Sequence, residues 1–325
     1  MLNPSDPSLG QDASLRPLAL PRLTQAHAPL TRTVQALNER GETEWLQIPA
    51  ERPLTVYVDK REIVTLMTLG AHPEWLVLGY LRNQRLVDAV DDIESVTVDW
   101  EVGAAAVRTR AGIERIEERT AHKVVTSGCG QGSVFGHWID EIERIALPQA
   151  RITQAQLYGI VNAIRLQEST YKSAGSVHGC ALFRGEALLL FVEDVGRHNA
   201  IDTIAGWMWL HGDGPPDQPV QTDRARWAQA AGMRGDDKVF YTTGRLTSEM
   251  VIKSAQMGVP VVVSRSGMTQ MGHAVAERLG LCAIGRAMNR RFVCYSGAER
   301  LQWQPELAQA AIAPSREGGS LPATD

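Results

Sequence analysis

The chain has 325 residues, a hydrophobic share of 44% and a formal net charge of −4. These values are ordinary for a globular protein with one large domain or two modest ones. The balance of charge provides no extended basic surface, so general binding to nucleic acid or to an anionic membrane is not expected. No signal peptide and no apolar run of about 20 residues is apparent, so we expect a cytoplasmic protein.

Cysteine usage narrows the sulfur chemistry that the chain can perform. The four cysteines stand at positions 129, 180, 282 and 294. They are too sparse for a disulfide framework, and none forms the Cys-x-x-Cys pair that builds zinc sites. Any sulfur chemistry is therefore expected to involve single thiols.

Composition divides the chain into four parts. Residues 1–45 and 306–325 are rich in small and polar residues, and we expect them to be flexible tails. Residues 46–120 are predicted to form a smaller, mainly β lobe, and residues 121–305 an α/β domain. The elements predicted for the smaller lobe are a hairpin of strands 54–59 and 63–67, a helix over 74–81, and strands over 96–98 and 104–109.

The larger domain alternates strands with helices. Its predicted helices cover residues 154–167, 199–210, 248–257 and 269–279, and its predicted strands cover 180–183, 188–192, 239–241, 259–263, 281–284 and 291–295. The order after residue 238 is β-α-β-α-β. Because parallel strands need crossover connections, this order predicts an α/β fold with a mostly parallel sheet covered by helices.

Two loops follow predicted strands in this domain. Residues 242–245 (Thr-Thr-Gly-Arg) and residues 264–268 (Ser-Arg-Ser-Gly-Met) each offer hydroxyls, a glycine and one arginine. Ligands of open α/β sheets bind beyond the carboxyl ends of the strands, and paired guanidinium groups suit a diphosphate or nucleotide. Capped turns with surface arginines explain the same pattern. Since no phosphate-loop spacing is present, the pattern alone favours ordinary turns.

A third cluster covers residues 193–199 (Glu-Asp-Val-Gly-Arg-His-Asn), with Asp202 one helical turn later. Such a crowd of titratable groups is compatible with an acid–base set or a ligand clamp. Capping of the following helix explains its Asp and Asn equally well. The local sequence therefore favours neither the functional interpretation nor the capping interpretation.

Cys129 differs from the other cysteines because it lies in a glycine-rich loop, residues 127–133. Its glycine neighbours leave the sulfur uncovered, so a thiolate there can attack a sulfane sulfur and hold it as a persulfide. An exposed loop cysteine without a role is the simpler interpretation of the pattern alone. A cysteine hydrolase lacks His and Asp partners that can be placed. The other three cysteines fit buried, small apolar residues.

Several motifs, taken in order, resemble the FdhD family of formate dehydrogenase accessory proteins over about residues 50–302. They are residues 55–58 (Thr-Val-Tyr-Val), 127–130 (Ser-Gly-Cys-Gly), 175–178 (Gly-Ser-Val-His), 193–202 (Glu-Asp-Val-Gly-Arg-His-Asn-Ala-Ile-Asp), 248–254 (Ser-Glu-Met-Val-Ile-Lys-Ser) and 260–266 (Pro-Val-Val-Val-Ser-Arg-Ser). The combination of the fourth and fifth motifs is the most specific.

The resemblance implies a sulfur carrier. Such a protein accepts persulfide sulfur from a cysteine desulfurase and transfers it to bis(molybdopterin guanine dinucleotide), the molybdenum or tungsten cofactor that formate dehydrogenase needs. The resemblance further implies a homodimer and a three-layer core related to the cytidine deaminase fold. The zinc ligands of nucleobase deaminases are missing here, so the relation concerns the fold and no intrinsic metal is expected.

By position, Cys129 matches the persulfide cysteine of the family. The cofactor-binding segment matches Val263, Ser264, Arg265, Ser266, Gly267 and Met268, and Arg245 on the neighbouring loop is expected to assist it. Many relatives have a second cysteine three positions after the first, where this chain has Gly132. A chaperone that binds the cofactor without transferring sulfur is therefore the alternative, and a nucleotide hydrolase or deaminase is a distant third.

Overall fold

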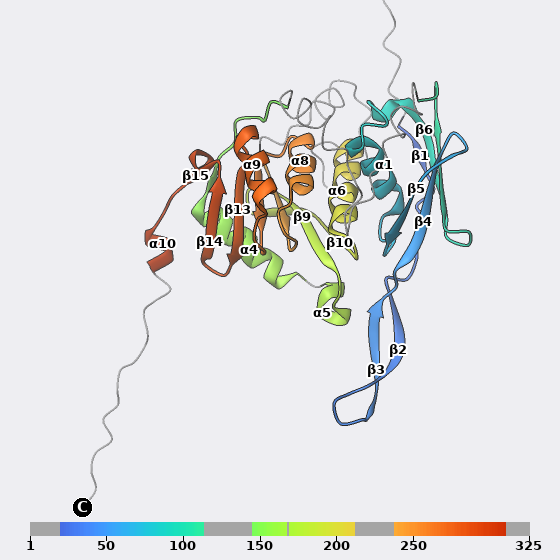
Figure 1. The fold of residues 1–325 in the computed structure, drawn as a ribbon, viewed down its shortest axis with the longest axis horizontal. Coiled ribbons are helices and arrows are strands. Elements are labelled where there is room, and N and C mark those ends of the chain that lie inside the picture. Colours follow the sequence, from blue (N-terminus) through green and yellow to red (C-terminus); the bar gives the residue numbers. More distant parts are fainter. Residues whose placement is uncertain (1–19, 114–144, 168, 212–236, 310–325) are drawn as a thin grey trace, which may run out of the picture.

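The structure is a computed structural model, and it describes residues 20–113, 145–167, 169–211 and 237–309. Within these residues two sheets, each with its own helices, lie side by side (Figure 1). A separate two-stranded hairpin projects from the smaller of the two units. Cys129 and its loop lie outside the described residues.

The smaller lobe is a five-stranded sheet with one helix packed on it. Its strand order is β1-β6-β7-β4-β5, and its elements are β1 (Arg22–Leu23), β4 (Arg52–Val58), β5 (Arg61–Thr68), α1 (Pro73–Asn83), the 3-10 helix η1 (Val90–Asp92), β6 (Ile93–Asp99) and β7 (Ala104–Thr109). Alternate residues of β4, namely Leu54, Val56 and Val58, are fully buried, as period-two alternation requires. The hairpin, helix and strands predicted for this lobe are confirmed.

The prediction of a flexible tail over residues 1–45 is wrong for its second half. β1 pairs in parallel with β6, and β2 (Thr31–Leu37) pairs with β3 (Thr43–Pro49) in an antiparallel ladder. The turn between β2 and β3 is held by Asn38, whose side chain accepts hydrogen bonds from the backbone N–H groups of Arg40 and Glu42, both at 3.0 Å. Polar composition hid this ladder because both of its strands are largely exposed.

The larger unit contains a six-stranded sheet in the order β10-β9-β11-β12-β13-β14. Its strands are β9 (His178–Arg184), β10 (Ala187–Asp194), β11 (Lys238–Thr242), β12 (Val261–Ser264), β13 (Cys282–Met288) and β14 (Arg291–Ser296). The predicted mostly parallel sheet is wrong, because only the β11–β12 and β12–β13 pairings are parallel. β9–β10 and β13–β14 are hairpins with short turns, and such connections make neighbouring strands antiparallel.

Helices lie on both faces of this sheet. One face packs against α6 (Arg197–His211), α8 (Ser248–Gln256) and α9 (Gln270–Leu279), and the other against α4 (Gln154–Leu166). The remaining elements are β8 (Ile152–Thr153), α5 (Thr170–Ala174), the 3-10 helix η2 (Ala298–Arg300), β15 (Leu301–Gln302) and α10 (Glu306–Gln309), which falls in the predicted carboxyl-terminal tail. The predicted helices and strands of this unit are confirmed, whereas a relation to cytidine deaminases stays a prediction.

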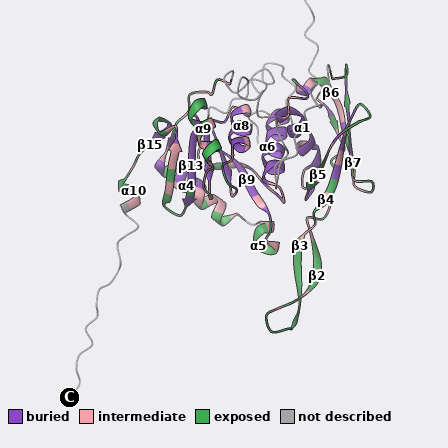
Figure 2. Cartoon of the chain, in the orientation of Figure 1, coloured by how far each residue is buried: buried purple, intermediate pink, exposed green. Residues whose placement is uncertain are grey.

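Helices α1 and α6 join the two units through two glycines. A Cβ atom on Gly79 would collide with the backbone carbonyl of Asp202, and one on Gly206 would collide with that of Trp75. The helix backbones can approach so closely only where side chains are missing. Figure 2 shows both helices as buried, so α6 belongs to the cores of both units and fixes their relative position.

Candidate functional site

The carboxyl ends of β11 and β12 lie side by side at one edge of the larger sheet. Thr242 pairs with Ser264, and the Arg265 N–H donates to the Thr242 carbonyl at 3.0 Å. The hydroxyl of Ser264 donates to the Gly244 carbonyl at 2.6 Å and accepts from the Ser266 N–H at 2.9 Å. One buried hydroxyl therefore ties the two predicted binding loops together.

The two loops present their arginines on this edge. Leu246 bridges to Met268, and its N–H donates to the Gly267 carbonyl at 3.0 Å, so the loops continue side by side. Arg245 and Arg265 are both exposed. Their guanidinium groups are thus available to an anionic ligand, whereas Ser264 is fully buried and can act only by shaping the loops.

The residues of the predicted cofactor-binding segment, 263–268, therefore differ in burial. Val263 and Ser264 are buried and hold the strand end, while Arg265 is exposed and Ser266, Gly267 and Met268 are half-buried. Only the last four of these residues present surface that a ligand can touch.

His178 also lies at this edge, at the start of β9, and sequence reasoning assigned it no role. The Gly179 N–H donates to the Thr243 hydroxyl at 3.1 Å, which holds the start of β9 against the loop after β11. Burial lowers the pKa of His178, and the charges of Arg197 and Arg245 lower it further. Its imidazole is therefore neutral at pH 7 and lies among cationic groups.

Arg197 opens helix α6 at the same edge. Its side chain is nearly buried and runs along Gly244, where a Cβ atom would lie 2.8 Å from the arginine Cδ. α6, α8 and α9 all begin beyond strand ends of this sheet edge, and helix amino termini favour negative charge. Arginines and helix starts together make the edge electropositive and suited to a phosphate-bearing ligand.

The first part of the cluster of residues 193–202 is held by structural partners, although the helix that it caps is α5 and not the following helix as the capping interpretation expected. The carboxylate of Glu193 accepts from the N–H groups of Thr170 and Tyr171 at the start of α5. Asp194 accepts hydrogen bonds from four groups, the Thr68 hydroxyl, the Leu69 and Gly196 N–H groups and the Asn199 side chain. Burial raises the pKa of Asp194, and these four bonds oppose that rise.

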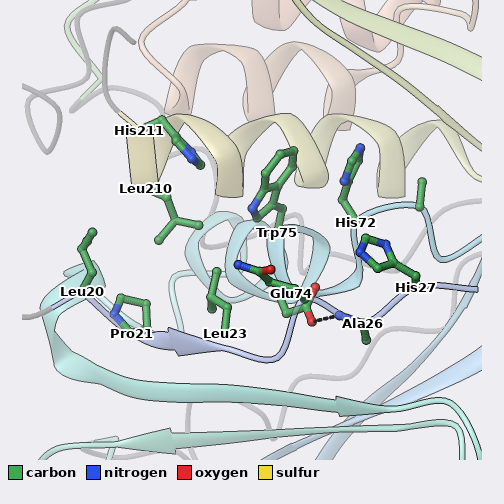
Figure 3. Close-up of a pocket in the computed structure, with 12 residues that line it drawn as sticks. Leu20, Pro21, Leu23, Ala26, His27, His72, Glu74, Trp75, Leu210 and His211 are labelled. Carbon is green, nitrogen blue, oxygen red and sulfur yellow. Dashed lines mark hydrogen bonds between the residues drawn. The ribbon is translucent and has the colours of Figure 1, made fainter. Parts of the chain in front are cut away.

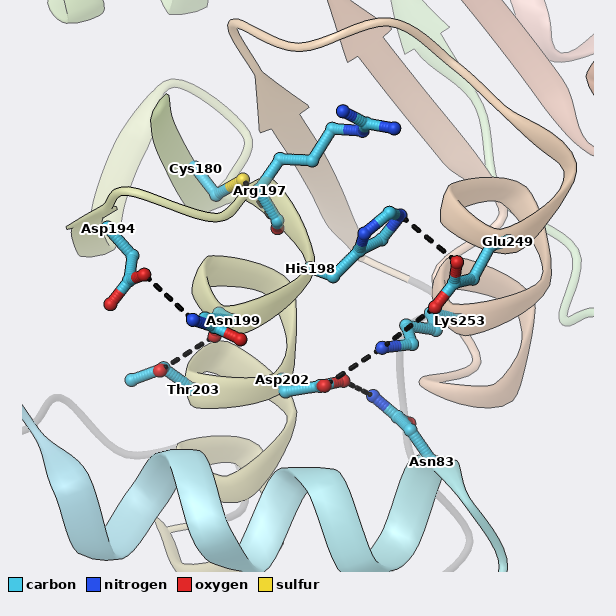
Figure 4. A network of polar contacts seen from close by, with 10 residues as sticks. All are labelled: Asn83, Cys180, Asp194, Arg197, His198, Asn199, Asp202, Thr203, Glu249 and Lys253. Carbon is cyan, nitrogen blue, oxygen red and sulfur yellow. Dashed lines mark hydrogen bonds and ion pairs between the residues drawn. The ribbon is translucent and has the colours of Figure 1, made fainter. Parts of the chain in front are cut away.

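Asp202 belongs to a second buried network, which Figure 4 shows between α1, α6 and α8. Its carboxylate accepts from the Asn83 amide at 2.7 Å and from the Lys253 ammonium group at 2.8 Å. Glu249 forms an ion pair with Lys253, with 3.5 Å between its carboxylate and the Lys253 Nζ, and its carboxylate lies 3.3 Å from the His198 Nε2. This network fixes the start of α8, directly after the loop that carries Arg245.

Of the described cysteines, Cys180 and Cys282 are fully buried, as predicted, while Cys294 is half-buried. The Cys180 thiol lies 3.3 Å from the Thr242 hydroxyl, beneath the sheet edge. Burial raises the pKa of Cys180 to about 12, so this thiol is protonated at neutral pH. Cys180 therefore cannot replace Cys129 as a nucleophile.

A pocket of about 530 Å³ lies in the smaller lobe, away from the strand-end loops (Figure 3). The chain around Leu23 forms one wall, and Trp75 with the imidazoles of His27, His72 and His211 lines much of the rest. His72 stacks on Trp75 with ring centroids 4.3 Å apart. This pocket could not be predicted from sequence patterns, because its walls come from three distant segments.

The described residues contain neither a metal-binding cluster nor a membrane-spanning helix. Within them no three or more His, Cys, Asp or Glu side chains are grouped so that they could hold a metal ion. No helix among them is both long and apolar enough to cross a membrane.

The fold and the site define a mixed α/β protein whose larger sheet ends in an edge with two exposed arginines. The crystal structure of a protein from Desulfotalea psychrophila, described as a formate dehydrogenase accessory protein, has a similar fold with a TM-score of 0.62. It is 22% identical, and the match covers 84% of this chain and all of that one.

The curated relatives of this chain are named sulfur carrier protein FdhD. The chain is 30% identical over 267 residues to the sulfur carrier protein FdhD of Bacillus subtilis, covering 81% of this chain and 94% of the relative. It is 27% identical over 257 residues to the sulfur carrier protein FdhD of Listeria innocua, covering 78% and 91%. The model of the FdhD/NarQ family matches residues 49–302, and the chain belongs to this family.

Proposed function

We propose that this protein is a cytoplasmic sulfur carrier in the maturation of formate dehydrogenase. The thiolate of Cys129 attacks the persulfide of a cysteine desulfurase, and the desulfurase cysteine leaves as a thiolate. The outer sulfur then passes to the metal of the molybdenum cofactor, bis(molybdopterin guanine dinucleotide), which is a bound substrate. The S–S bond breaks, Cys129 leaves as a thiolate, and the reduced metal of the cofactor supplies the two electrons that convert sulfane sulfur to sulfide. Relatives named sulfur carrier protein FdhD support this assignment.

The observation that carries the proposal is the pair of interlocked loops after β11 and β12. Arg245 and Arg265 are exposed on them, and a guanidinium group holds phosphate oxygens through two parallel hydrogen bonds. Ser266, Gly267 and Met268 extend the contact surface toward the nucleotide. The metal belongs to the cofactor that is carried, so the protein needs no metal ligands of its own.

Sulfur loading tests the chemical step. After incubation with a cysteine desulfurase and cysteine, mass spectrometry should find one added sulfur atom on the peptide that contains Cys129, and cyanide should release it as thiocyanate. Cys129→Ala should abolish the added sulfur, whereas Cys294→Ala, which removes a half-buried thiol elsewhere, should not. Equal loading of the Cys129→Ala protein would refute the proposal.

Nucleotide binding tests the loops separately from the sulfur. Guanosine diphosphate should bind the protein in calorimetry, and Arg265→Ala or Arg245→Ala should weaken binding about tenfold or more, the worth of one lost charge-assisted contact. Arg278→Ala is the matched control, because this exposed arginine lies at the carboxyl end of α9, away from the edge. Equal effects of all three substitutions would remove the loops from the binding site.

A cofactor-binding chaperone without sulfur transfer is the second candidate, favoured by Gly132 where many relatives have a second cysteine. A lone thiol cannot form a resolving disulfide within its own loop. This candidate predicts that cells with the Cys129→Ala protein still produce active formate dehydrogenase, while cells with the Arg265→Ala protein do not. Loss of activity with both variants would favour the sulfur carrier.

A further inference from the structure

His178 begins strand β9 at the same sheet edge as the two loops, and the sulfur-carrier mechanism gives it no role. The carbonyl of Gly179 accepts from the Thr243 N–H at 2.9 Å, and the Gly179 N–H donates to the Thr243 hydroxyl at 3.1 Å. These two hydrogen bonds fix the start of β9 beside the loop that carries Arg245. His178 therefore lies at the rim of the proposed binding site.

Strand register places the side chain of His178 on the face of the sheet that α6 covers. Side chains alternate along a strand, so His178 shares a face with Cys180, two positions later. The Cys180 sulfur lies 3.3 Å from the Thr242 hydroxyl and 4.0 Å from the Arg197 carbonyl (Figure 4). His178 is one step nearer to the strand end, where α6 begins and β11 ends.

The chain enters β9 through a strained turn. Gly175 has a φ of +64° and Ser176 a φ of +53°, and this left-handed region is unfavourable for a residue with a Cβ atom. Strained backbone persists where the surrounding structure holds it, and it gathers at functional sites. Here the turn joins α5 to β9 and sets the direction in which His178 enters the edge.

Charged groups from three elements surround His178. Burial lowers the pKa of its imidazole, and the charges of Arg197 on α6 and Arg245 on the loop after β11 lower it further. Asp194 on β10 pairs with His178 in the sheet, but four hydrogen bonds from other groups occupy its carboxylate. Among the described residues the half-buried imidazole forms no hydrogen bond, so its ring nitrogens are not committed to this part of the chain.

We propose that His178 is a further phosphate ligand of this site and takes up a proton when a diphosphate binds. This inference rests on the proposed function, which places the diphosphate of the cofactor at Arg245 and Arg265. Without a ligand, the neighbouring cations oppose protonation of the imidazole. A bound diphosphate offsets those cations, so the imidazole takes a proton from the buffer and donates a charge-assisted hydrogen bond to a phosphate oxygen.

Proton uptake makes binding depend on pH in a fixed direction. A group whose pKa rises on binding strengthens that binding as the pH falls toward the pKa of the free protein. Each unit by which binding raises the pKa contributes up to about tenfold in affinity. Affinity should therefore rise about fivefold or more from pH 8 to pH 6. The arginines stay charged throughout this range and cannot produce such a slope.

Calorimetry of the full chain with diguanosine diphosphate tests this proposal. Each phosphorus of this probe keeps one strongly acidic group, so the phosphates themselves do not titrate between pH 6 and pH 8. Measurements at pH 7 in buffers of different ionisation heat count the protons that are taken up on binding. The natural protein should take up a substantial fraction of one proton. His178→Gln should take up none, and it should bind the probe equally at pH 6 and pH 8.

His72→Gln is the matched control. His72 is also half-buried, and burial lowers its pKa as well, but it lies in the smaller lobe, away from the strand-end loops. This variant should take up as many protons on binding as the natural protein. A merely structural role of His178 would change affinity without changing the proton count, so the count separates the two roles.

The outcomes distinguish this inference from the proposed function. Binding that Arg245→Ala weakens but that takes up no proton, or uptake that persists in His178→Gln, would overturn the role of His178 and leave the sulfur carrier standing. No binding of the probe would overturn both His178 and the loops as a phosphate site. Proton uptake as expected, together with a failure to load sulfur on Cys129, would overturn the carrier and leave His178 as a phosphate ligand.

Imidazole NMR resonances of the natural protein give a second measurement if His178→Gln fails to fold. With histidine labelled, the pKa of one imidazole should rise when diguanosine diphosphate binds, and those of the smaller lobe should not change. Binding that leaves every histidine pKa unchanged would overturn the proposal.

Discussion

The ammonium group of Lys253 lies fully buried between two carboxylates, and its removal has a large predicted cost. Burial alone would lower the pKa of Lys253, but the charges of Asp202 and Glu249 raise it. The lysine is therefore charged in the folded protein. Lys253→Met keeps most of the apolar stem and removes the ammonium group, with its charge and its hydrogen bond to Asp202.

The size of the expected loss of stability follows from the carboxylates that Lys253→Met leaves without their cation. Asp202, which is also buried, would retain one hydrogen bond from Asn83 and the charge of Arg82, but no cation bonded to its carboxylate. Breaking a buried pair by removing one partner costs about 3–5 kcal/mol, a large part of the roughly 5–15 kcal/mol that stabilises a typical domain. Burial raises the pKa of Glu249, so this carboxyl takes up a proton more readily once Lys253 is absent. The loss should therefore be smaller at pH 5 than at pH 8.

Urea denaturation followed by tryptophan fluorescence measures this loss, with the exposed Lys60→Met as control. The double variant Lys253→Met with Asp202→Asn should recover at least half of the loss. The new amide is neutral, and its oxygen still accepts from Asn83. A single variant that loses less than about 1 kcal/mol, or a double variant less stable than the single one, would refute the reasoning.

Three further predictions concern packing, pH and thiol reactivity. Gly206→Ala should cost about 3 kcal/mol or more in urea denaturation, because its Cβ meets the α1 backbone, whereas Gly267→Ala should cost little, since the nearest atom would be 3.9 Å away. Burial lowers the pKa values of His72 and His211 below 6.5, so the unfolded chain binds more protons below that pH and stability should fall as pH decreases from 7 to 5. His72→Gln should reduce this slope, and an unchanged slope would contradict the assignment. Iodoacetamide should leave Cys180 unlabelled at pH 7.5 in the folded protein, and labelling without unfolding would show that its thiol is not sealed.

Sequence patterns predicted the local elements of this fold but not how they pair. Apolar periodicity found the helices and strands because burial imposes it, as in β4 and α8. The direction of β9 and β10 depends on a two-residue turn around Gly185, which forces a hairpin beside the parallel strands. The β2–β3 hairpin was not predicted for the opposite reason, since an exposed ladder leaves no burial pattern in its sequence.

The candidate site was predicted in part for similar reasons. The loops after β11 and β12 were found because strand ends are general ligand sites, and the structure joins them through Ser264. Sequence could not show that this serine is buried, or that His178 reaches the same edge from an antiparallel strand. The buried network around Lys253 draws residues from α1, α6 and α8, and only the folded chain brings them together.

Helix α6 links these observations, because it carries three contacts with different purposes on successive turns. Arg197 lies at the strand-end edge, Asp202 pairs with Lys253, and Gly206 touches α1 of the smaller lobe. A helix this short is stiff, so a displacement at Gly206 moves Arg197 as well. We therefore expect Gly206→Ala to weaken the binding of guanosine diphosphate although the substitution lies about two and a half helical turns from Arg197. Unchanged nucleotide affinity in a folded Gly206→Ala protein would show that the edge does not depend on the contact between the two units.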